Sequence, residues 1–495
     1  SGIYTIPDFL EYRYNEFSRL IMAICTLVIL VGVPTASVIF SGAKVITGNF
    51  QGVVIPGLEF DLGNITVGCW IIGVLAAAYV FAGGLKACAW ADLIQGSALI
   101  IGGVIIAYLA MDLLADTDAT ELVKTARSPE VTAESLEQAG PIQRFWDLNK
   151  GELPEGKVHM VRDGGDKEIP WTALLIGLWI PNFFYWGLNQ YITQRTLGSK
   201  SLAEGQKGII FAAFLKLIIP FIVVVPGILA FNLFNADLKD DAVNRNAQLL
   251  AEYSPSLYSR LSDQMKPDAT SDRNKTIIKT IDEHLSAKQT EPTKLQLYEF
   301  DEVFAGLQTK DVADIVAFNY EQITEKVDVE KMPADVQKLP GDEITSLALA
   351  QYNAKLIQAG SGGITSEVAV EELVAHDYDN AFPTLIRRLL KPGSGIKGFV
   401  LAAIFGAVVS SLASMLNSAS TIATMDIYRK IHRNASERAL VASGRFFVVL
   451  FVLIAMIIAP FLGHPRFGGI FTFIQEFQGF ISPGILAIFL FGLLV

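Results

Sequence analysis

The sequence is poor in the residues that carry redox and metal chemistry. It has three cysteines and five histidines in 495 residues, and no cysteines have the spacing of a zinc or redox site. Cys25, Cys69 and Cys88 lie in or beside apolar runs, so we expect them to be small buried hydrophobic residues. The long acidic region at 237–379 holds no catalytic triad, phosphate loop or metal cluster. Nothing therefore indicates an enzyme.

Charge is also scarce, and apolar sequence takes its place. Charged residues make up 18% of the chain and hydrophobic residues 51%, with a mean hydropathy of +0.41. Soluble core helices seldom exceed about 14 residues and show a polar face, whereas a membrane span needs about 20 mainly apolar residues. The composition therefore predicts an all-α, multi-pass membrane protein of the plasma or inner membrane. Eight runs are long enough: roughly 17–41, 65–84, 90–114, 169–191, 208–234, 396–424, 440–462 and 468–495.

The charges that remain are unevenly placed. Residues 116–169 hold 12 acidic and 7 basic side chains, residues 237–379 hold 27 and 14, and the rest of the chain holds 11 and 18. Basic residues gather in cytoplasmic connections, so both acidic regions are expected outside and both ends of this chain inside. The net charge of −11 therefore arises from the regions expected outside the cell. No nucleic-acid partner is expected. The basic connections contain Arg195, Lys200, Lys207, Arg429, Lys430, Arg433 and Arg438.

These patterns divide the chain into five parts. We expect transmembrane helices in 1–115, 169–235 and 381–495, an extracellular loop at 116–168 and an acidic extracellular insertion at 236–380. The insertion has helix-like stretches separated by prolines and a Gly-Ser-Gly-Gly turn, as in a small soluble domain, and its function is unassigned. Three spans precede the first loop and five follow it. A five-plus-five inverted repeat that lacks its first two spans has this count.

The run 169–191 has Pro181-Asn182 at its middle. Proline frees backbone carbonyls, and an interrupted helix is tolerated in a membrane only where it is buried in protein or lines a water-filled cavity. Aromatic residues with polar atoms follow at Tyr185 and Trp186. Secondary transporters build solute sites from broken helices at the bilayer midplane. The sequence therefore predicts a transporter with a solute site near Pro181.

A set of motifs follows the whole membrane part. They are YTIPDFLEYRYN (4–15), GGLKACAWADLIQG (83–96), NFFYWGLNQYITQRTL (182–197), GIIFAAFLKLIIPF (208–221), DNAFPTLI (379–386), AAIFGAVVSSLASMLNSASTIATMDIYRK (402–430) and FIQEFQGFISPG (473–484). In this order they resemble the sodium/solute symporter family, most closely its bacterial sodium/galactose and animal sodium/glucose members. Ala91 replaces the family's usual threonine. The resemblance implies a five-plus-five inverted-repeat core, of which this chain supplies core helices three to ten.

The resemblance also implies a sugar site. Asn182 would bind a hydroxyl, Tyr185 would stack on the pyranose as the inner gate, and Trp186 would pack beside it. Lys216 and Gln475 match residues of the family that contact sugar. From position alone, Tyr185 and Trp186 could equally face lipid as an interfacial belt, and Lys216 could extend to the cytoplasmic surface.

For the ion, the resemblance points to Ala407, Ser410 and Ser411. Their i, i+3 and i, i+4 spacing places them on one helix face, and sodium prefers hard oxygen ligands such as hydroxyls and carbonyls. A serine-rich face for helix packing is the alternative. Asp92 matches an aspartate on the family's sodium exit route, although a charge favouring the helix dipole would explain it too.

The function expected is sodium-coupled import of a hexose, of galactose or glucose type, by alternating access. The partners expected are the sugar, the sodium ion and the lipid bilayer. Two alternatives are a symporter of the same fold for another solute, such as an inositol or sialic acid, and a sugar sensor that does not transport.

Overall fold

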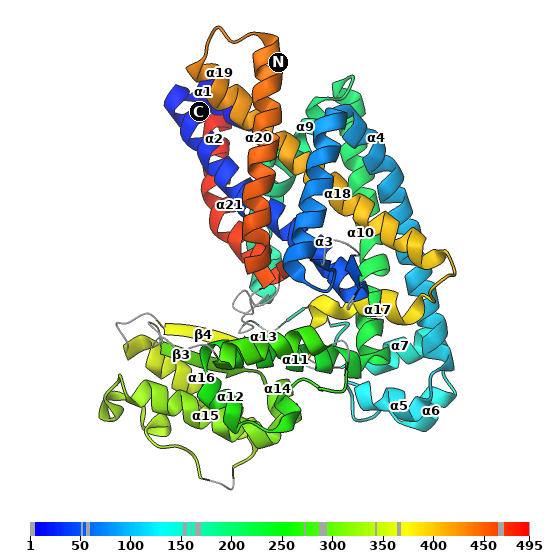
Figure 1. The fold of residues 1–495 in the computed structure, drawn as a ribbon, viewed down its shortest axis with the longest axis vertical. Coiled ribbons are helices and arrows are strands. Elements are labelled where there is room, and N and C mark those ends of the chain that lie inside the picture. The colour runs from blue at the N-terminus through cyan, green and yellow to red at the C-terminus, as the bar shows by residue number, and fades with distance from the viewer. Residues whose placement is uncertain are drawn as a thin grey trace. The chain divides into compact units, whose positions relative to one another are not determined.

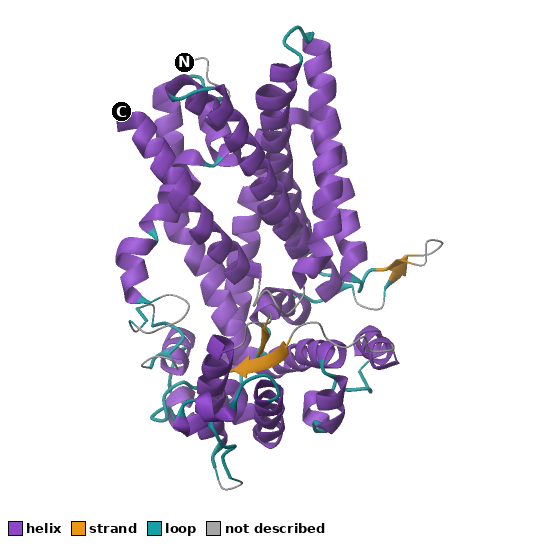
Figure 2. Cartoon of the chain, turned by 90° about the vertical axis from the view of Figure 1, so that its left-hand side faces the viewer, coloured by secondary structure: helices purple, strands orange, loops and turns teal. Residues whose placement is uncertain are grey.

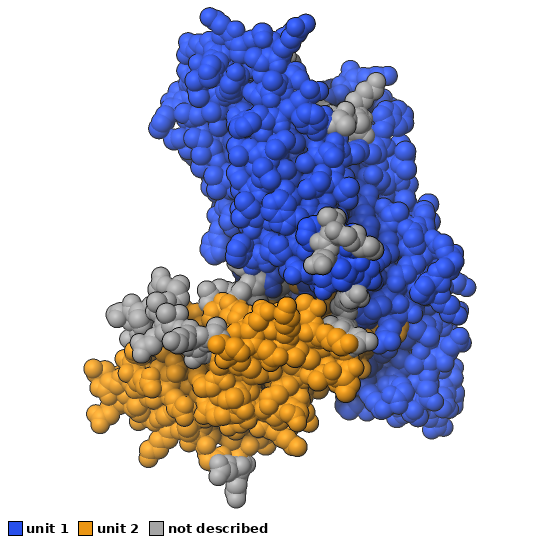
Figure 3. All heavy atoms as spheres, viewed as in Figure 1, with its two compact units in different colours: residues 1–233, 382–463, 470–495 blue, residues 234–381, 464–469 orange. Residues whose placement is uncertain are grey.

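The computed structural model is mainly helical (Figures 1 and 2). It describes residues 5–50, 53–55, 60–151, 156–159, 161–162, 164, 170–271, 274–286, 295–341, 344–363, 368–463 and 470–494, without the side chains of 82–88, 361–363 and 470–472. The chain divides into two compact units (Figure 3). The first unit contains 1–233, 382–463 and 470–495, and the second contains 234–381.

The first unit consists of long apolar helices and a few short connections. Helices dominate because a chain surrounded by hydrocarbon must satisfy its backbone hydrogen bonds internally. Its helices are α1 (Ile6–Arg13), α2 (Glu16–Leu30), η1 (Val31–Thr35), α3 (Ala36–Asn49), α4 (Ile65–Asp116), η3 (Ala173–Gly177), α8 (Trp179–Phe183), η4 (Phe184–Leu188), α9 (Gln190–Leu197), α10 (Leu202–Leu233), α17 (Ala381–Leu389), α18 (Ile396–Ile422), η10 (Ala423–Tyr428), α19 (Arg429–Ile431), α20 (Glu437–Ile458), η11 (Ala459–Gly463) and α21 (Ile470–Leu494).

Six helical segments of the described chain are long and apolar enough to cross a membrane. They are Glu16–Asn49, Ala89–Asp116, Leu202–Leu233, Ile396–Ile431, Glu437–Gly463 and Phe473–Leu494. Two of the eight expected runs correspond to shorter apolar stretches: Ile65–Phe81, which is the first part of the continuous helix α4 and so is not separated from Ala89–Asp116, and Ala173–Leu188. The second of these is short because π-helical turns and an extended residue interrupt it. The multi-pass helical membrane protein predicted from composition is thus what the structure shows.

Small residues let the helices of this unit approach closely. A Cβ at Gly68 of α4 would lie 3.0 Å from the Cβ of Ala43 on α3, and one at Gly103 would lie 2.1 Å from a methyl group of Ile222 on α10. In lipid no hydrophobic force drives helices together, so dispersion forces at such close contacts hold them against one another. A larger side chain at Gly103 would therefore push α4 and α10 apart.

The connection between α4 and η3 is ordered by one arginine. It contains α5 (Ala119–Leu122), η2 (Val123–Thr125), α6 (Ala133–Glu137) and α7 (Pro141–Asn149). Arg144 of α7 is buried and donates hydrogen bonds to the carbonyls at the end of α4, namely those of Leu114, Ala115 and Thr117, at 2.9–3.0 Å. The last carbonyls of a helix lack partners within it, so Arg144 both caps α4 and fixes α7 against it.

The second unit mixes helices with a small parallel sheet. Its elements are α11 (Asn235–Tyr253), α12 (Pro255–Arg260), η5 (Asp263–Met265), α13 (Lys275–Ser286), β3 (Leu295–Phe300), α14 (Glu302–Leu307), α15 (Thr309–Thr324), η7 (Val329–Lys331), η8 (Ala334–Val336), α16 (Ser346–Gly363), β4 (Val368–Leu373) and η9 (Tyr378–Asn380). β3 and β4 pair in register from Leu295–Val368 to Phe300–Leu373. The first unit has only the antiparallel pair β1 (Val54–Ile55) and β2 (Phe60–Asp61) among its described residues.

The second unit has its own core. Tyr298 of β3 is fully buried, and its hydroxyl donates to Ser254 Oγ at 2.8 Å. Asn319 of α15 pairs with the backbone of Tyr298 in both directions, at 2.7 and 2.9 Å. Phe304, Leu356 and Leu373 are fully buried in the same apolar cluster. A buried polar group that is fully hydrogen-bonded specifies one arrangement of its neighbours, so this insertion is a folded domain.

Two sequence expectations need correction. The chain is not all-α, because β3 and β4 form a parallel pair whose residues are mostly buried. The cysteines also differ from one another: Cys69 is buried, but Cys25 of α2 is exposed on the surface of the membrane unit. An exposed cysteine costs nothing there because that surface is apolar. The side chain of Cys88 lies outside the described residues.

Candidate functional site

The helix that begins at Ala173 is interrupted twice. Pro181 lies within α8, between the π-helical segments η3 and η4, and the turn residue Leu178 separates η3 from α8 just before the proline. Proline lacks the N–H that would continue the ladder, and a wider π turn accommodates this loss. A second interruption follows at Asn189, which is extended with ψ of 115°.

Another interruption lies in the first long span. The π-helical segment η1 contains Pro34 and separates α2 from α3. Thr35 satisfies one of the freed carbonyls, since its Oγ1 donates to Leu30 O at 2.7 Å. π segments inside helices occur frequently at functional sites.

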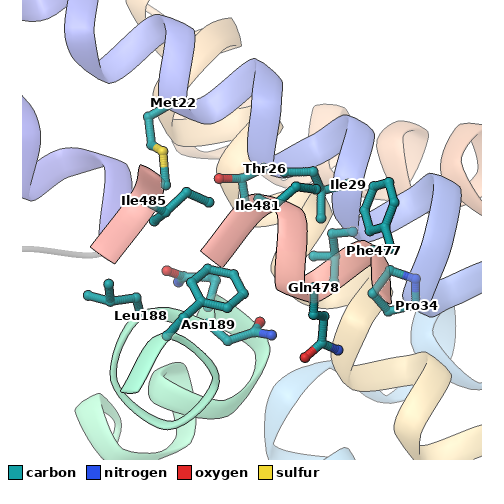
Figure 4. Close-up of a pocket in the computed structure, with 13 residues that line it drawn as sticks. Met22, Thr26, Ile29, Pro34, Leu188, Asn189, Phe477, Gln478, Ile481 and Ile485 are labelled. Carbon is teal, nitrogen blue, oxygen red and sulfur yellow. The ribbon is translucent and has the colours of Figure 1, made fainter. Parts of the chain in front are cut away.

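A narrow cavity lies between the interruptions at Pro34 and Asn189 and the helix α21 (Figure 4). α2 and η1 line one side, the segment around Asn189 a second side, and α21 a third. Its volume is about 30 Å³, which has room for one or two water molecules and not for a sugar. A solute could occupy this region only in another conformation. Its lining is Met22, Thr26, Ile29, Leu30, Pro34, Phe184, Leu188, Asn189, Gln190, Phe477, Gln478, Ile481 and Ile485.

Tyr185 and Trp186 of η4 do not line this cavity. They lie next to Lys216 of α10. Lys216 Nζ is 4.8 Å from the ring centroid of Trp186 and 5.6 Å from that of Tyr185. The rings of Tyr185 and Trp186 meet edge to face at 5.9 Å. A cation is attracted electrostatically to the face of an aromatic ring. This attraction keeps the ammonium group of the exposed Lys216 near the two rings.

The break at Asn189 is what brings Tyr191 to Tyr185. Residues six apart point in different directions on a regular helix, yet the Tyr191 hydroxyl donates to that of Tyr185 at 3.0 Å. Their rings meet edge to face at 6.1 Å. The interruption therefore produces a compact group of aromatic rings, hydroxyls and an ammonium ion, here called the Tyr185 cluster: Tyr185, Trp186, Tyr191 and Lys216.

Neither of the other two expected sugar contacts is hydrogen-bonded to this cluster among the described residues. Asn182 is exposed, and its side-chain amide donates to Leu178 O at 2.7 Å, within its own helix. Gln475 is exposed on α21, and it does not line the cavity, whereas Gln478, three residues later, does. Gln478 is thus a polar residue that sequence reasoning missed, although it belongs to the FIQEFQGFISPG motif, and Asn189 of the 182–197 motif lines the cavity with it.

The expected sodium ligands lie midway along α18. Ser410 is buried, and its hydroxyl donates to Ala407 O at 3.3 Å. Ser411 is exposed, so its hydroxyl points away from the packed face that Ser410 occupies. The helix face with Ser410, Ser414 and Ser418 is buried, and each of these hydroxyls bonds to the preceding turn.

We expect Ser411→Ala to raise the sodium concentration needed for half-maximal uptake, because it removes a hydroxyl that is free to coordinate an ion. Uptake measured against sodium concentration checks this. Ser420→Ala is the matched control, since Ser420 is on the same helix and bonds to Asn417 O. An unchanged sodium dependence for Ser411→Ala would remove this residue from the ion site.

Asp92 lies in the middle of α4, too far from its N-terminus for the helix dipole to explain it, and it forms an ion pair with Arg195. Arg195 Nη2 donates to both Asp92 Oδ2 and Ser414 Oγ, and so connects α4, α9 and α18. Gln194 Nε2 donates to Ser414 O at 3.3 Å. Asp92 and Arg195 are about a quarter and a third exposed, at 24% and 35%. An ion that bound Asp92 would compete with Arg195 for it.

A larger ionic cluster, which sequence reasoning missed, joins the start of the chain to η10, the π-helical segment that continues α18. The Asp426 side chain is fully buried and accepts hydrogen bonds from Arg19 Nε at 2.7 Å and Thr5 Oγ1 at 2.8 Å. Arg19 also donates to Asp8 and Glu11, at 2.5 and 2.6 Å. A single local pattern could not reveal it, because Arg19 and Asp426 are 407 residues apart.

Glu11 links this cluster to the basic end of the same helix. Lys430 Nζ donates to Glu11 Oε1 at 2.5 Å, and this bond together with that from Arg19 holds the pKa of Glu11 below its ordinary value of 4.5. The folded state therefore favours the carboxylate more than the unfolded chain does. This contribution to stability is complete above pH 4.5 and is lost as the pH falls through the folded-state pKa.

Glu11→Gln is accordingly expected to lower the thermal unfolding midpoint at about pH 7, with the difference from wild type shrinking between about pH 5 and about pH 3. Scanning fluorimetry in detergent across this range measures it. Glu437→Gln, at an exposed position, serves as the control. A difference that stays constant over the whole range would show that Glu11 does not act through its charge.

The arrangement so far is a helical membrane unit with interrupted helices around a small, mainly apolar cavity that has a few polar residues in its lining. A family model described as "Sodium:solute symporter family" matches residues 1–266 and 351–495. The chain belongs to this family. The unmatched residues, 267–350, lie inside the second unit. The family is one of membrane symporters and not of enzymes.

Comparison with curated proteins gives several relatives. The chain is 31% identical over 500 residues to "Sodium/glucose cotransporter" of Vibrio parahaemolyticus, covering 99% of this chain and 62% of that protein. It is 24% identical to "Sodium/glucose cotransporter 1" of Oryctolagus cuniculus, covering 100% and 53%. It is 22% identical to "Sodium/myo-inositol cotransporter" of Homo sapiens, covering 100% and 50%. The chain thus spans less than two thirds of the length of these relatives.

Among solved structures, one comparison is with a sodium-coupled sialic acid symporter in a substrate-bound, outward-open state. The TM-score is 0.49 at 17% identity, and the match covers 99% of this chain and 66% of the other.

Proposed function

We propose that the protein is a sodium-coupled symporter that imports a hexose, of galactose or glucose type, by alternating access. The observation that carries this is the Tyr185 cluster, where Lys216 lies 4.8 Å from the Trp186 ring beside the Tyr185 hydroxyl. Sugars need hydrogen bonds for their hydroxyls and an aromatic face for their C–H groups. The cluster offers both. Relatives named as sodium/glucose cotransporters support the same class of solute.

In this proposal Tyr185 stacks on the sugar as the inner gate, with Trp186 beside it and Lys216 donating to hydroxyls. Asn182 and Gln475 complete the site when the helices rearrange, because the cavity in this conformation is too small for a hexose. The fold is a five-plus-five inverted repeat, with its binding region beside interrupted helices. The insertion 236–380 and the loop 116–168 lie outside the cell.

Sodium is the driving ion. It would bind the hydroxyls of Ser410 and Ser411 and nearby carbonyls such as that of Ala407, and it would leave past Asp92. Its binding favours transport only through a higher affinity for the outward-open state. A membrane potential of 100 mV adds about 2.3 kcal/mol per charge, which is equivalent to about fifty-fold accumulation.

Uptake into proteoliposomes with an inward sodium gradient tests the proposal. We expect radiolabelled galactose or glucose to accumulate above its external concentration and to leak out when the gradient is collapsed. Accumulation of myo-inositol or sialic acid in place of both hexoses would select the other solutes, for which named relatives also exist. Saturable sugar binding without any flux would indicate a sensor instead.

A further inference from the structure

Arg195 places its guanidinium group against residues on the proposed path of the ion. Its Nη2 atom donates to the carboxylate of Asp92 on α4 and to the hydroxyl of Ser414 on α18. The same hydroxyl of Ser414 donates to Ser410 O at 3.0 Å. The guanidinium group therefore connects the turn of α18 that holds Ser410 to the carboxylate of Asp92.

The short helix α9 holds the guanidinium group in this position. Arg195 Nη1 donates to Tyr191 O at 3.3 Å within α9. Gln194 Nε2 donates to Ser414 O at 3.3 Å, which fastens α9 to α18. A group that is fixed beside its partner meets it at a high effective concentration. Arg195 is thus a cation tethered next to Asp92.

The ion pair is accessible to a second cation. The side chains of Asp92 and Arg195 are both partly exposed. Among the described residues, only the Oδ2 atom of Asp92 accepts a hydrogen bond, and carboxylate oxygens are hard ligands. Sodium and guanidinium carry the same charge, so an exchange of one for the other keeps Asp92 compensated. A carboxylate left without any cation in a membrane segment would be costly.

We propose that Arg195 is a tethered competitor of sodium, which exchanges with the ion at Asp92 and so drives its release. The inference rests on the proposed sodium route past Asp92 and does not depend on which solute is carried. An ion pair that served only to hold α4 and α9 together would have a different signature. Its loss would destabilise the protein without raising its affinity for sodium, whereas the loss of a competitor raises that affinity.

Sodium binding can be measured without any solute, because an ion that binds the folded state raises the unfolding temperature. The full chain in detergent is unfolded thermally while sodium chloride replaces potassium chloride at constant ionic strength. We expect Arg195→Gln to be half-saturated at a sodium concentration about fivefold lower than wild type, the scale of a partly exposed ion pair. In proteoliposomes its maximal rate of sodium-driven uptake should fall, because the ion leaves Asp92 more slowly.

Two further variants test the origin of this change. Arg195→Lys keeps the charge but loses the contacts of the guanidinium group with Ser414 and Tyr191, so its half-saturating sodium concentration should lie between those of Arg195→Gln and wild type. This order stays testable if Arg195→Gln does not fold. Combining Arg195→Gln with Asp92→Asn should abolish the gain in affinity, because the carboxylate for which the two cations compete is gone.

Lys207→Gln is the matched control, since Lys207 is 74% exposed and pairs with Glu204 on its own helix. Its affinity for sodium should equal that of wild type. The proposal is overturned if sodium does not stabilise the wild-type protein, if folded Arg195→Gln or Arg195→Lys binds sodium no more tightly than wild type, or if the gain persists with Asp92→Asn. Absence of hexose uptake by the wild type, with the expected order of sodium affinities intact, would count against the proposed solute and not against Arg195.

Discussion

Tyr185→Ala should abolish sodium-driven sugar uptake while the protein stays folded. The substitution removes the ring that meets Trp186 edge to face at 5.9 Å and the hydroxyl that accepts from Tyr191 at 3.0 Å. Lys216 also loses one of its two aromatic neighbours. Since stacking and hydrogen bonding are both lost, uptake of radiolabelled hexose into proteoliposomes should fall to background.

Two further variants separate a role in binding from a role in folding. Tyr185→Phe keeps the ring and should retain part of the uptake. Tyr108→Ala removes a tyrosine that is 69% exposed on α4 of the same unit and should leave uptake unchanged. Uptake at the wild-type level in folded Tyr185→Ala protein would exclude Tyr185 from the site.

Asp426→Asn is expected to destabilise the membrane unit strongly. Asp426 is fully buried, and its partner Arg19 is 10% exposed. Neutralising Asp426 removes the fully buried partner of Arg19 and leaves it with the partly exposed Asp8 and Glu11, so a large part of the about 3–5 kcal/mol cost of breaking a buried ion pair is expected. The thermal unfolding midpoint in detergent should therefore drop sharply.

The origin of that loss can be tested with a double substitution. Arg19→Met combined with Asp426→Leu removes both charges and should recover much of the stability, because an apolar pair of similar size often replaces a buried ion pair without cost. Arg433→Gln is the control, since Arg433 is 78% exposed and lies 3.9 Å from Glu16. If Asp426→Asn unfolds at the wild-type temperature, the buried pair does not hold these segments together.

Features that depend on composition and local pattern could be predicted from the sequence. The apolar runs at 17–41, 396–424 and 440–462 correspond to long apolar helices, because about 20 apolar residues have few alternatives to a spanning helix. The motif around Tyr185 pointed to a group of aromatic residues and Lys216, and the structure places these side chains together. Whether they bind sugar is a prediction that uptake must test.

Features that depend on distant contacts could not be predicted. Pro181 indicates a break, and the helix is irregular just before it at Leu178, but the second interruption at Asn189 has no proline to announce it. The buried pair of Arg19 and Asp426 joins positions 407 residues apart. Asn246 of α11 likewise pairs with Val374, 128 residues later, and no periodicity encodes either contact.

The most direct test of the account is tryptophan fluorescence of the purified protein as galactose or glucose is added with and without sodium. Trp186 is one of six tryptophans, and a sugar beside Tyr185 would change its surroundings. We predict a saturable, sodium-dependent change in emission that is absent from folded Trp186→Phe protein. The same change in Trp186→Phe, with sodium-dependent uptake intact, would show that the solute binds elsewhere.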